Sequence, residues 1–344
     1  MVPLITSPED LPPLLSASLS VKEKAWIQTT DFPFAVTPHF ASLAGPEPDD
    51  PIRRQFMPDP REAQTDPFAL DDPLGEKLYQ ITPRLVHQYR DRVLLLAGGR
   101  CAGFCRYCFR RKRLPGAFIS RNELEPVLAY LNSQPGIREI LVSGGDPLCA
   151  DNGELEELFT KLRKARPGIF IRLCSRVPIT NPARLTQETI SLLVRFRPMR
   201  LVTHINHSRE LGTGDRLASI VEAGIPVHVQ TVLLRGINDN AETLAALFRD
   251  CLDLGLCPYY LFQMDLAPGA AHFRVPLKEG LSIYRDLGRR IGGLGLPAFA
   301  VDLPGGGGKI RLDEGAIAGE EDRPGGRVYL LKGMDGRFWA YPAD

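Results

Sequence analysis

The sequence predicts an α/β protein organised around a partial (β/α)6 barrel similar to a TIM barrel. From about residue 92 onward, short β-rich runs alternate with amphipathic helical patterns, which is typical of parallel βα units. The chain has 344 residues, 44% of them hydrophobic, so it can bury the core of one α/β barrel or of two ordinary domains. A group of three cysteines and a Ser-Gly-Gly-Asp run follow the first and second β-rich runs, where the loops of a barrel carry its chemistry.

The barrel is expected to span residues 86–310. Residues 1–85 are richer in proline and acidic residues, which predicts a mostly helical and irregular region packed onto the barrel. Residues 311–344 form a C-terminal extension, in which 327–331 and 337–341 predict the two strands of a β-hairpin.

Six parallel strands and six helices are expected within the barrel. The strands are expected at residues 92–97, 139–143, 169–175, 200–206, 227–234 and 259–265. The helices are expected at residues 122–132, 152–165, 187–196, 215–223, 241–254 and 277–291. In the second helix, apolar residues recur at helical spacing opposite Glu154, Glu157 and Lys161, as in a helix that covers a sheet.

Charge and cysteine usage narrow the class of protein. The 42 basic and 41 acidic residues leave a formal charge of +1, so no overall field would attract nucleic acid or an anionic membrane, and a small-molecule substrate is expected. No basic segment with a long apolar run opens the chain, and no run of about 18 apolar residues occurs, which predicts a soluble, cytoplasmic protein. Seven cysteines, three of them between positions 101 and 108, favour thiolate ligation in a reducing compartment over a disulfide framework.

The three crowded cysteines, Cys101, Cys105 and Cys108, follow the first predicted strand through Gly98 and Gly99. Spacings of four and three residues allow one tight loop to place three thiolates around one face of an iron–sulfur cluster. Structural zinc sites and ferredoxin-type loops usually supply four ligands, and the sequence has no fourth Cys or His close by. Three ligands for a 4Fe-4S cube leave one iron free to bind the amino and carboxylate groups of S-adenosylmethionine (SAM). The four remaining cysteines lie in apolar surroundings and are expected to be buried: Cys149, Cys174, Cys251 and Cys257.

The string CAGFCRYCFRRKR, from Cys101 to Arg113, resembles the radical SAM superfamily and, within it, the lysine 2,3-aminomutase family. The resemblance runs nearly end to end, from Phe34 to about Lys309. It implies a barrel of the radical SAM type and an isomerase, L-lysine 2,3-aminomutase, that interconverts L-α-lysine and β-lysine. It also implies a one-electron reductant such as flavodoxin or ferredoxin, and a homo-oligomer.

The segment Ser143-Gly144-Gly145-Asp146 ends the second predicted strand. Glycines let backbone carbonyls approach a ligand closely, although the same run can form an ordinary tight βα turn. The resemblance implies that this segment holds the amino end of SAM. It implies SAM contacts also for residues at the ends of the next three strands, each of which could instead hydrogen-bond in the core: Ser175, Arg176, Thr203, His204, Asn206 and Gln230.

A second motif, PGGGGK at residues 304–309, leaves the backbone free to pass close to a bulky ligand. Ile310 stands where a Walker A loop needs Ser or Thr, so the motif is not a P-loop. A partly desolvated lysine forms Schiff bases, the usual anchor for pyridoxal 5′-phosphate (PLP), whereas a lysine after a flexible loop can also be merely exposed. The resemblance implies that Lys309 carries PLP and that Arg92 binds its phosphate, with Tyr89 nearby.

The resemblance also assigns the substrate contacts. It implies that Arg110 binds the carboxylate of the amino acid and that Asp265 and Asp302 bind the ε-ammonium of lysine, although a lone Asp is often a surface or helix-capping residue. A position of the PLP-phosphate site that is usually basic in relatives is Gln88 here. His272 matches a family segment without an assigned role.

The implied reaction is a 2,3-amino shift. An electron from the cluster splits SAM into methionine and a 5′-deoxyadenosyl radical, which removes hydrogen from C3 of lysine held as a PLP aldimine. Nitrogen then moves to C3 and the hydrogen returns, so that SAM is regenerated. The protein contributes orientation and the exclusion of water and oxygen.

Three alternatives accompany this hypothesis. A mutase of the same type could act on arginine, which is also cationic at its far end. The lysine reaction could instead supply β-lysine for modifying elongation factor P, because no cysteine follows Cys257 and the C-terminal zinc segment of longer family members is missing, so that no zinc is expected. A non-enzymatic iron–sulfur or RNA-binding module is the third alternative.

Overall fold

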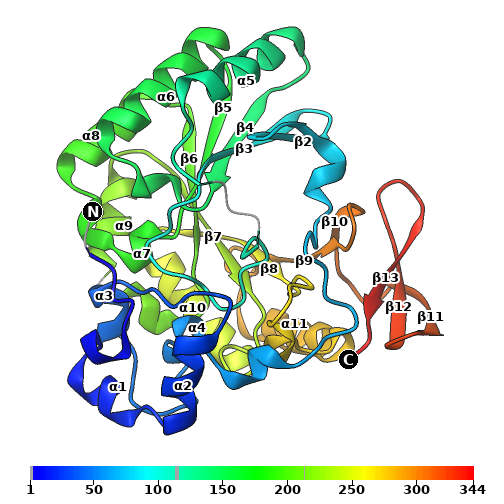
Figure 1. The fold of residues 1–344 in the computed structure, drawn as a ribbon. Helices are drawn as coiled ribbons and strands as arrows, with labels where there is room; N and C mark the ends of the chain where they lie inside the picture. The colour runs from blue at the N-terminus through cyan, green and yellow to red at the C-terminus, as the bar shows by residue number, and fades with distance from the viewer. Residues whose placement is uncertain (1–2, 113–115, 213) are drawn as a thin grey trace.

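The structure, a computed structural model, describes residues 3–112, 116–212 and 214–344 (Figure 1). Its centre is a ten-stranded sheet in which the strands follow one another in chain order from β1 to β10. The strands are β1 (Gln80–Thr82), β2 (Leu85–Tyr89), β3 (Arg92–Gly98), β4 (Glu139–Gly144), β5 (Phe170–Cys174), β6 (Met199–His204), β7 (Val227–Val232), β8 (Cys257–Phe262), β9 (Ala298–Leu303) and β10 (Gly308–Arg311). Strands β3 to β9 pair in parallel, whereas β1, β2 and β10 add antiparallel strands at the two ends.

Helices connect the parallel strands and cover the outer face of the curved sheet, as Figure 1 shows for α5, α6 and α8. The connecting helices are α5 (Arg121–Ser133), α6 (Asn152–Ala165), α7 (Val177–Thr180), α8 (Gln187–Arg195), α9 (Asp215–Glu222), α10 (Ala241–Asp253) and α11 (Leu277–Arg290). Four further helices precede the sheet: α1 (Pro13–Ser18), α2 (Val21–Thr29), α3 (Pro38–Ser42) and α4 (Arg53–Phe56).

Helix α6 shows how the predicted pattern becomes a packed layer. Asp151 caps its first turn by accepting a hydrogen bond from the Glu154 amide, 2.8 Å away, which satisfies an otherwise unpaired donor. Its apolar stripe, from Leu155 to Leu162, is buried in the hydrophobic core. The stripe therefore attaches the helix to the sheet, while its charged face stays toward solvent.

The predicted fold class is confirmed, with one parallel strand more than the six expected. Strand β9 pairs in parallel with β8, next to the expected last strand. Its six residues, Ala298–Leu303, are a short and mostly apolar run, which by its periodicity alone could also be a buried helical segment. This strand carries Asp302 into the site and starts the turn that returns as β10.

Side-chain hydrogen bonds link the two ends of the sheet. The backbone N–H of Lys309 on β10 donates to the Tyr89 hydroxyl on β2, at 2.9 Å. The carbonyl of Gly306 accepts hydrogen bonds from Gln88 Nε2 at 3.1 Å and from the Tyr79 hydroxyl at 2.8 Å. These hydrogen bonds connect β2 and the segment before β1 to the glycine loop at the other end of the open sheet.

The C-terminal extension is a three-stranded antiparallel sheet, so the predicted hairpin lacks one strand. Strands β12 (Gly326–Lys332) and β13 (Phe338–Pro342) form the expected hairpin, and β11 (Ile317–Arg323) pairs with β12 on its other side. Most residues of β11 are exposed and charged, which explains why its sequence lacks a strand pattern. Trp339 on β13 packs against the glycine loop, because a Cβ on Gly307 would lie 2.6 Å from its ring.

Buried ion pairs attach the N-terminal region to the barrel mouth. Glu62 binds both Arg106 and Arg111, which flank the last cysteine of the loop, and all three side chains are at most 6% exposed. The predicted limits of the domains at residues 85 and 310 stay a prediction, since β2 lies across the first of them.

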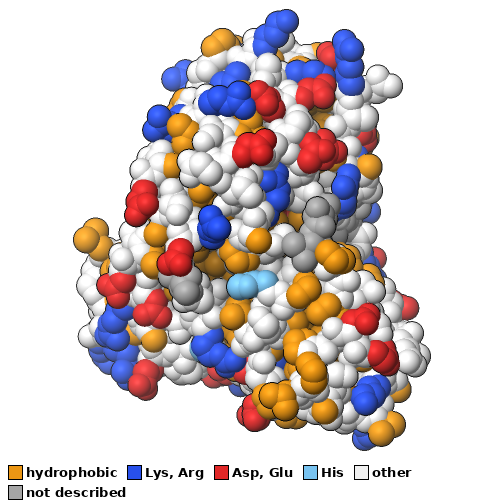
Figure 2. All heavy atoms as spheres, turned by 90° about the vertical axis from the view of Figure 1, so that its left-hand side faces the viewer, with side chains coloured by type: hydrophobic (Ala, Val, Ile, Leu, Met, Phe, Trp, Pro, Cys, Tyr) orange, Lys and Arg blue, Asp and Glu red, His pale blue; other side chains and the backbone are white. Residues whose placement is uncertain are grey.

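The distribution of charged side chains on the surface agrees with the near-neutral composition. Figure 2 shows basic and acidic side chains interspersed over one face of the molecule, without a large area of one sign. None of the described helices has both the length and the apolar character needed to cross a bilayer.

Candidate active site

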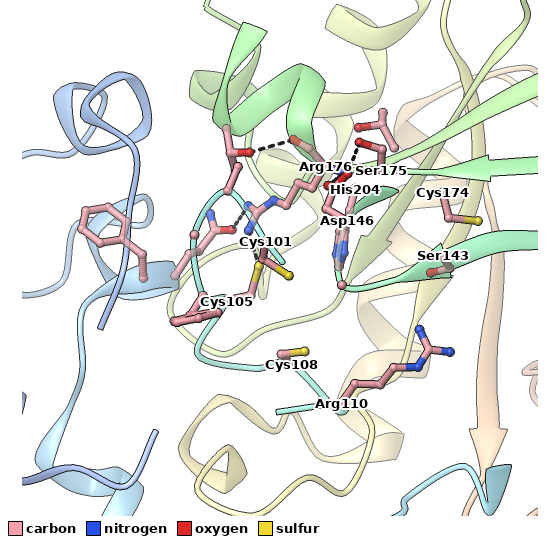
Figure 3. Close-up of a pocket in the computed structure, with 18 of the residues that line it drawn as sticks. Cys101, Cys105, Cys108, Arg110, Ser143, Asp146, Cys174, Ser175, Arg176 and His204 are labelled. Atoms are coloured by element: carbon pink, nitrogen blue, oxygen red, sulfur yellow. Dashed lines mark hydrogen bonds between the residues drawn. The ribbon is translucent and has the colours of Figure 1, made fainter. Parts of the chain in front are cut away.

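Three cysteines line one pocket of about 220 Å³ at the carboxyl ends of the first parallel strands (Figure 3). Cys101, Cys105 and Cys108 lie on the loop that follows β3, and all three thiols are free. Gly103 within this loop has a φ of 130°, which favours glycine, and pairs with Val36 of the N-terminal region. The loop is therefore anchored from outside the barrel.

Burial disfavours the thiolate form of two of the three thiols. Burial raises the pKa of Cys108 to about 11, and burial together with Asp146 raises the pKa of Cys101 well above its usual range. Thiolates at these positions need a nearby cation, so binding of iron would release protons. Arg176 Nη1, 2.9 Å from Cys105 Sγ, supplies one such positive partner.

A cube of four irons binds each thiolate through a different iron, so its ligands face one cavity instead of converging on one point. In the described part of the chain, no three His, Cys, Asp or Glu side chains are arranged to hold a single metal ion. The loop instead presents three thiols to a shared pocket, which fits a cluster held at three of its corners.

Gly144 and Gly145 at the end of β4 allow the cysteine loop to pass close by. A Cβ on Gly144 would lie 2.4 Å from the Gly98 carbonyl, and a Cβ on Gly145 would lie 2.5 Å from the Arg100 carbonyl. Gly144 also has a φ of 119°, which L side chains rarely adopt. The two glycines therefore have a packing role at this junction, besides lining the pocket.

The Asp146 carboxylate is occupied by protein groups. It accepts hydrogen bonds from the Ser175 hydroxyl at 2.6 Å and from the backbone N–H groups of Arg176 and Val177 at 2.6 and 3.0 Å. Asp146 thus holds the loop after β5 in place. Ser143, by contrast, lines the pocket without a hydrogen bond from its own side chain in the described part of the chain.

A buried polar network supports the floor of the pocket. The Arg176 guanidinium donates to Glu210 at 2.8 Å and to Gln55 at 2.6 Å. Asn206 is fully buried and donates to Gln55 Oε1 at 3.0 Å, so it lies behind the pocket and does not line it. His204 does line the pocket; burial and the nearby Arg176 lower its pKa to about 3, which keeps the imidazole neutral. Thr203 and Gln230 line the pocket as well.

Lys309 lies at the opposite side of the barrel mouth, on β10. Its Nζ is 2.5 Å from Asp302 Oδ2 on β9 and 3.8 Å from the centre of the Phe262 ring. The β9–β10 register places Lys309 directly opposite Asp302. Arg92 stacks on the Tyr89 ring, 3.9 Å from its centre, so the residues expected around PLP gather at this end of the sheet.

Asp265 and Arg110 face the same region between the thiols and Lys309. Burial and the negative charge of Asp302 raise the pKa of Asp265 to about 8, while Lys309 and Arg110 lower it. Arg110 is itself paired with Glu76, whose carboxylate accepts from Nε at 3.1 Å and also from Nη2. Glu76 holds one edge of the guanidinium and leaves Nη1 for another anion.

The comparisons with known proteins agree with this arrangement. Residues 95–248 match the model of the Radical SAM superfamily. A Treponema pallidum (strain Nichols) protein provisionally named L-lysine 2,3-aminomutase is 45% identical over 85% of this chain and 83% of its own. L-lysine 2,3-aminomutase of Escherichia coli (strain K12) is 40% identical over 77% of this chain and 79% of its own. L-lysine 2,3-aminomutase of Bacillus subtilis (strain 168) is 34% identical over 97% of this chain and 71% of its own.

The chain belongs to the L-lysine 2,3-aminomutase family. The superfamily match covers the cysteine loop and the pocket at the ends of β4 to β7, and it stops before the strands that carry Asp265, Asp302 and Lys309. The family match over 97% of the chain extends across those strands. The superfamily match therefore covers the part of the mouth with the three thiols, whereas the family match also covers the part with Asp265, Asp302 and Lys309.

Several other residues differ from their expected surroundings. Cys149 and Cys251 are buried as expected, but Cys174 is half-buried and lines the pocket, and Cys257 is exposed at the start of β8. These two expectations were wrong because inward-facing and edge positions of a strand look alike in sequence. Both ring nitrogens of His272 are buried without a hydrogen-bond partner in the described part of the chain.

Sequence reasoning missed the groups that support the site from distant segments. Gln55, Glu76 and Glu210 are each buried against an arginine of the mouth, 34 to 121 residues away in sequence. No motif marks them, because their partners are set by the folded chain. Arg113, the last residue of the cysteine motif, lies outside the described residues.

Proposed function

We propose that this protein is an L-lysine 2,3-aminomutase that interconverts L-α-lysine and β-lysine with the help of SAM, a 4Fe-4S cluster and PLP. One observation carries the proposal: two carboxylates, Asp265 and Asp302, meet beside Lys309, across the mouth from three free thiols. Relatives that are 34–45% identical bear the name of this activity, which supports the assignment.

The two ends of the mouth suit different groups. We assign Cys101, Cys105 and Cys108 to the cluster and the pocket around Ser143, Ser175 and His204 to SAM; when bound, these groups supply a 5′-deoxyadenosyl radical. Gly144, Gly145 and Gln230 line the same pocket, and Asp146, Arg176 and Asn206 are assigned to its support.

Lys309 is assigned as the anchor of PLP, which supplies a π system that stabilises an unpaired electron next to nitrogen. Asp302 Oδ2, 2.5 Å from Lys309 Nζ, is placed to accept the proton that the ammonium loses before its nitrogen attacks a carbonyl. Tyr89 fixes the backbone of Lys309 and stacks with Arg92, so both residues orient this anchor.

The charges of the mouth match the two ends of lysine. Arg110 offers its Nη1 edge to the α-carboxylate, while Glu76 holds the other edge. Asp265 and Asp302 repel each other when both are ionised, and a cation between them removes this cost. An ε-ammonium is such a cation, whereas an uncharged side chain would leave the carboxylates unpaired.

We also propose flavodoxin or ferredoxin as the electron donor, a cytoplasmic location and a homo-oligomeric state. A reducing compartment would keep the three cluster thiols free, as they are in the structure. Size-exclusion chromatography with light scattering would measure the oligomeric state directly.

An anaerobic assay tests the function. The purified protein, reconstituted with iron and sulfide and supplied with SAM, PLP and a reductant, is expected to form β-lysine from L-lysine. Arginine and glutamate serve as competing substrates. Asp265→Asn is expected to reduce kcat/KM for lysine at least tenfold, because it removes one of the two anions that bind the ammonium. The absence of β-lysine, or a preference for arginine, would contradict the assignment.

A further inference from the structure

A second pocket lies beside Lys309 and shares no lining residue with the pocket of the thiols. It has a volume of about 350 Å³, and four of its lining residues are cations: Arg92, Lys309, Arg311 and Lys332. They come from β3, β10 and the end of β12, so three distant parts of the chain meet there. No acidic residue is among the described residues that line this pocket.

These cations are only partly neutralised. Arg92 pairs with Asp91 at 2.9 Å, but the Asp91 side chain is 60% exposed, and Lys309 pairs with Asp302 outside the pocket lining. Arg311 and Lys332 have no ion-pair partner within residues 3–112, 116–212 and 214–344. Like charges around one cavity repel each other, and an anion in the cavity relieves that repulsion.

Gln88 does not contribute a charge to this pocket. Its amide is neutral, and its Nε2 donates to the Gly306 carbonyl at 3.1 Å, so the side chain holds the glycine loop. The cations that line this pocket therefore come from other positions of the chain.

The C-terminal sheet is positioned to supply it. Trp339 of β13 packs against Gly307 of the glycine loop, and Lys332 pairs with Phe338 at the turn between β12 and β13. Because the sheet is seated on the loop that precedes Lys309, the position of Lys332 relative to that lysine is fixed by packing.

We propose that Arg311 and Lys332 join Arg92 in binding the phosphate monoester of PLP, and that the C-terminal sheet thereby completes the cofactor site. The inference rests on the proposed function, since it needs the aldehyde end of the cofactor at Lys309. A phosphate monoester is nearly a dianion at neutral pH, and three converging cations suit its charge and its three terminal oxygens.

Titration of the PLP-free full-length protein with PLP and with pyridoxal, which lacks the phosphate, tests the inference. The readout is the visible absorbance that depends on Lys309, so no turnover is needed. Lys332→Ala and Arg311→Ala are each expected to raise the Kd for PLP about tenfold and to leave the Kd for pyridoxal unchanged. Lys332→Arg is expected to keep most of the PLP affinity, because it keeps the charge.

Lys278→Ala is the matched control. Lys278 is on α11, and its Nζ lies 4.8 Å from the ring of Tyr329, which belongs to the same sheet as Lys332. Lys278 does not line the pocket, so its loss is expected to leave both affinities unchanged. Equal weakening of PLP and pyridoxal binding by Lys332→Ala, or unchanged PLP binding, would overturn this inference and leave the proposed function standing. A wild-type protein that gives no Lys309-dependent absorbance with either aldehyde would overturn the proposed function and the inference with it.

Discussion

The charged residues of the mouth show how single side chains acquire their properties from neighbours that are distant in sequence. Arg110 is two residues past Cys108, yet its partner Glu76 stands on the short helix Glu76–Tyr79 before β1. Both side chains are at most 13% exposed, so their ion pair is largely shielded from water. Sequence alone points to Arg110 through the family motif, whereas nothing in it points to Glu76.

Replacement of Glu76 by glutamine is therefore expected to act on substrate binding through Arg110. The KM for lysine should rise about tenfold with a smaller effect on kcat, since the guanidinium keeps its charge but loses the carboxylate that orients it. Steady-state kinetics with lysine measure the split. Binding of 1,5-diaminopentane, which lacks a carboxylate, serves as the control and should not change. Equal weakening of both ligands would show that Glu76 has only a structural role.

The three thiols can be tested one residue at a time. Cys105→Ala is expected to abolish the visible absorbance of the cluster after anaerobic reconstitution, because two thiolates cannot hold a four-iron cube in place. Cys257→Ala is the matched control, since Cys257 is exposed at the start of β8. Iron and sulfide content of both variants provides the measurement. A cluster that survives in Cys105→Ala would remove this residue from the ligand set.

Asp265 predicts a pH dependence of stability. Its pKa is raised from 3.8 to about 8 in the folded protein, so between these values the native state binds more protons than the unfolded chain. The free energy of unfolding therefore falls as pH rises from about 4 to about 8. Asp265→Asn, which cannot ionise, should be more stable than wild type by on the order of 5 kcal/mol at pH 8 and similar to it at pH 4.

Urea unfolding of the protein without cofactors at both pH values measures this difference. Asp313→Asn offers a control at an exposed carboxylate. If wild type and Asp265→Asn lose stability in parallel as pH rises, the raised pKa of Asp265 is wrong.

At the scale of elements, the loop after β3 and the end of β4 depend on each other. The backbone of the cysteine loop passes so close to Gly145 that a methyl group does not fit without movement. Strand ends that carry ligands thus need glycine for packing as well as for access of a ligand. The sequence shows that Gly144 and Gly145 are present, but only the close approach of the chain after β3 shows that they are needed for packing.

Gly145→Ala is expected to displace Arg100 and the loop that begins with Cys101. The cost in the free energy of unfolding should be roughly 1–3 kcal/mol, together with a loss of affinity for SAM. Gly168→Ala is the matched control, because no heavy atom lies within 4 Å of a Cβ at that position. Isothermal titration with SAM and chemical unfolding give the two measurements; a variant that binds SAM like wild type would contradict the tight junction.

On the scale of the whole molecule, the N-terminal region and the C-terminal sheet hold the mouth from opposite sides. Glu62 clamps Arg106 and Arg111 of the cysteine loop, and Trp339 packs against the glycine loop. Both supports lie outside the parallel strands. The barrel thus supplies the positions of the reactive groups, and the two flanking regions hold the loops that carry them.

Glu62→Ala is expected to destabilise the protein by roughly 3–5 kcal/mol, because it leaves two buried guanidinium groups without their carboxylate. Glu157→Ala, which removes a surface ion pair on α6, should change the stability by less than about 1 kcal/mol. Denaturant unfolding of both variants compares the losses. Similar small values for the two would show that the buried cluster does not anchor the loop.

The sequence by itself determined the fold class, the three-thiol loop and the glycine-loop lysine. Periodic apolar residues, cysteine spacing and consecutive glycines are local properties, so they can be read along the chain. β11 was not predicted because its residues are mostly exposed and charged, and β9 was not predicted because a six-residue, mostly apolar run does not by itself distinguish a strand from a buried helical segment. Only the tertiary structure decided that Glu76 holds Arg110, that Asp265 has a raised pKa, and that Lys332 reaches the pocket beside Lys309. Each of these depends on contacts between segments far apart in the chain, and such contacts exist only after the chain has folded.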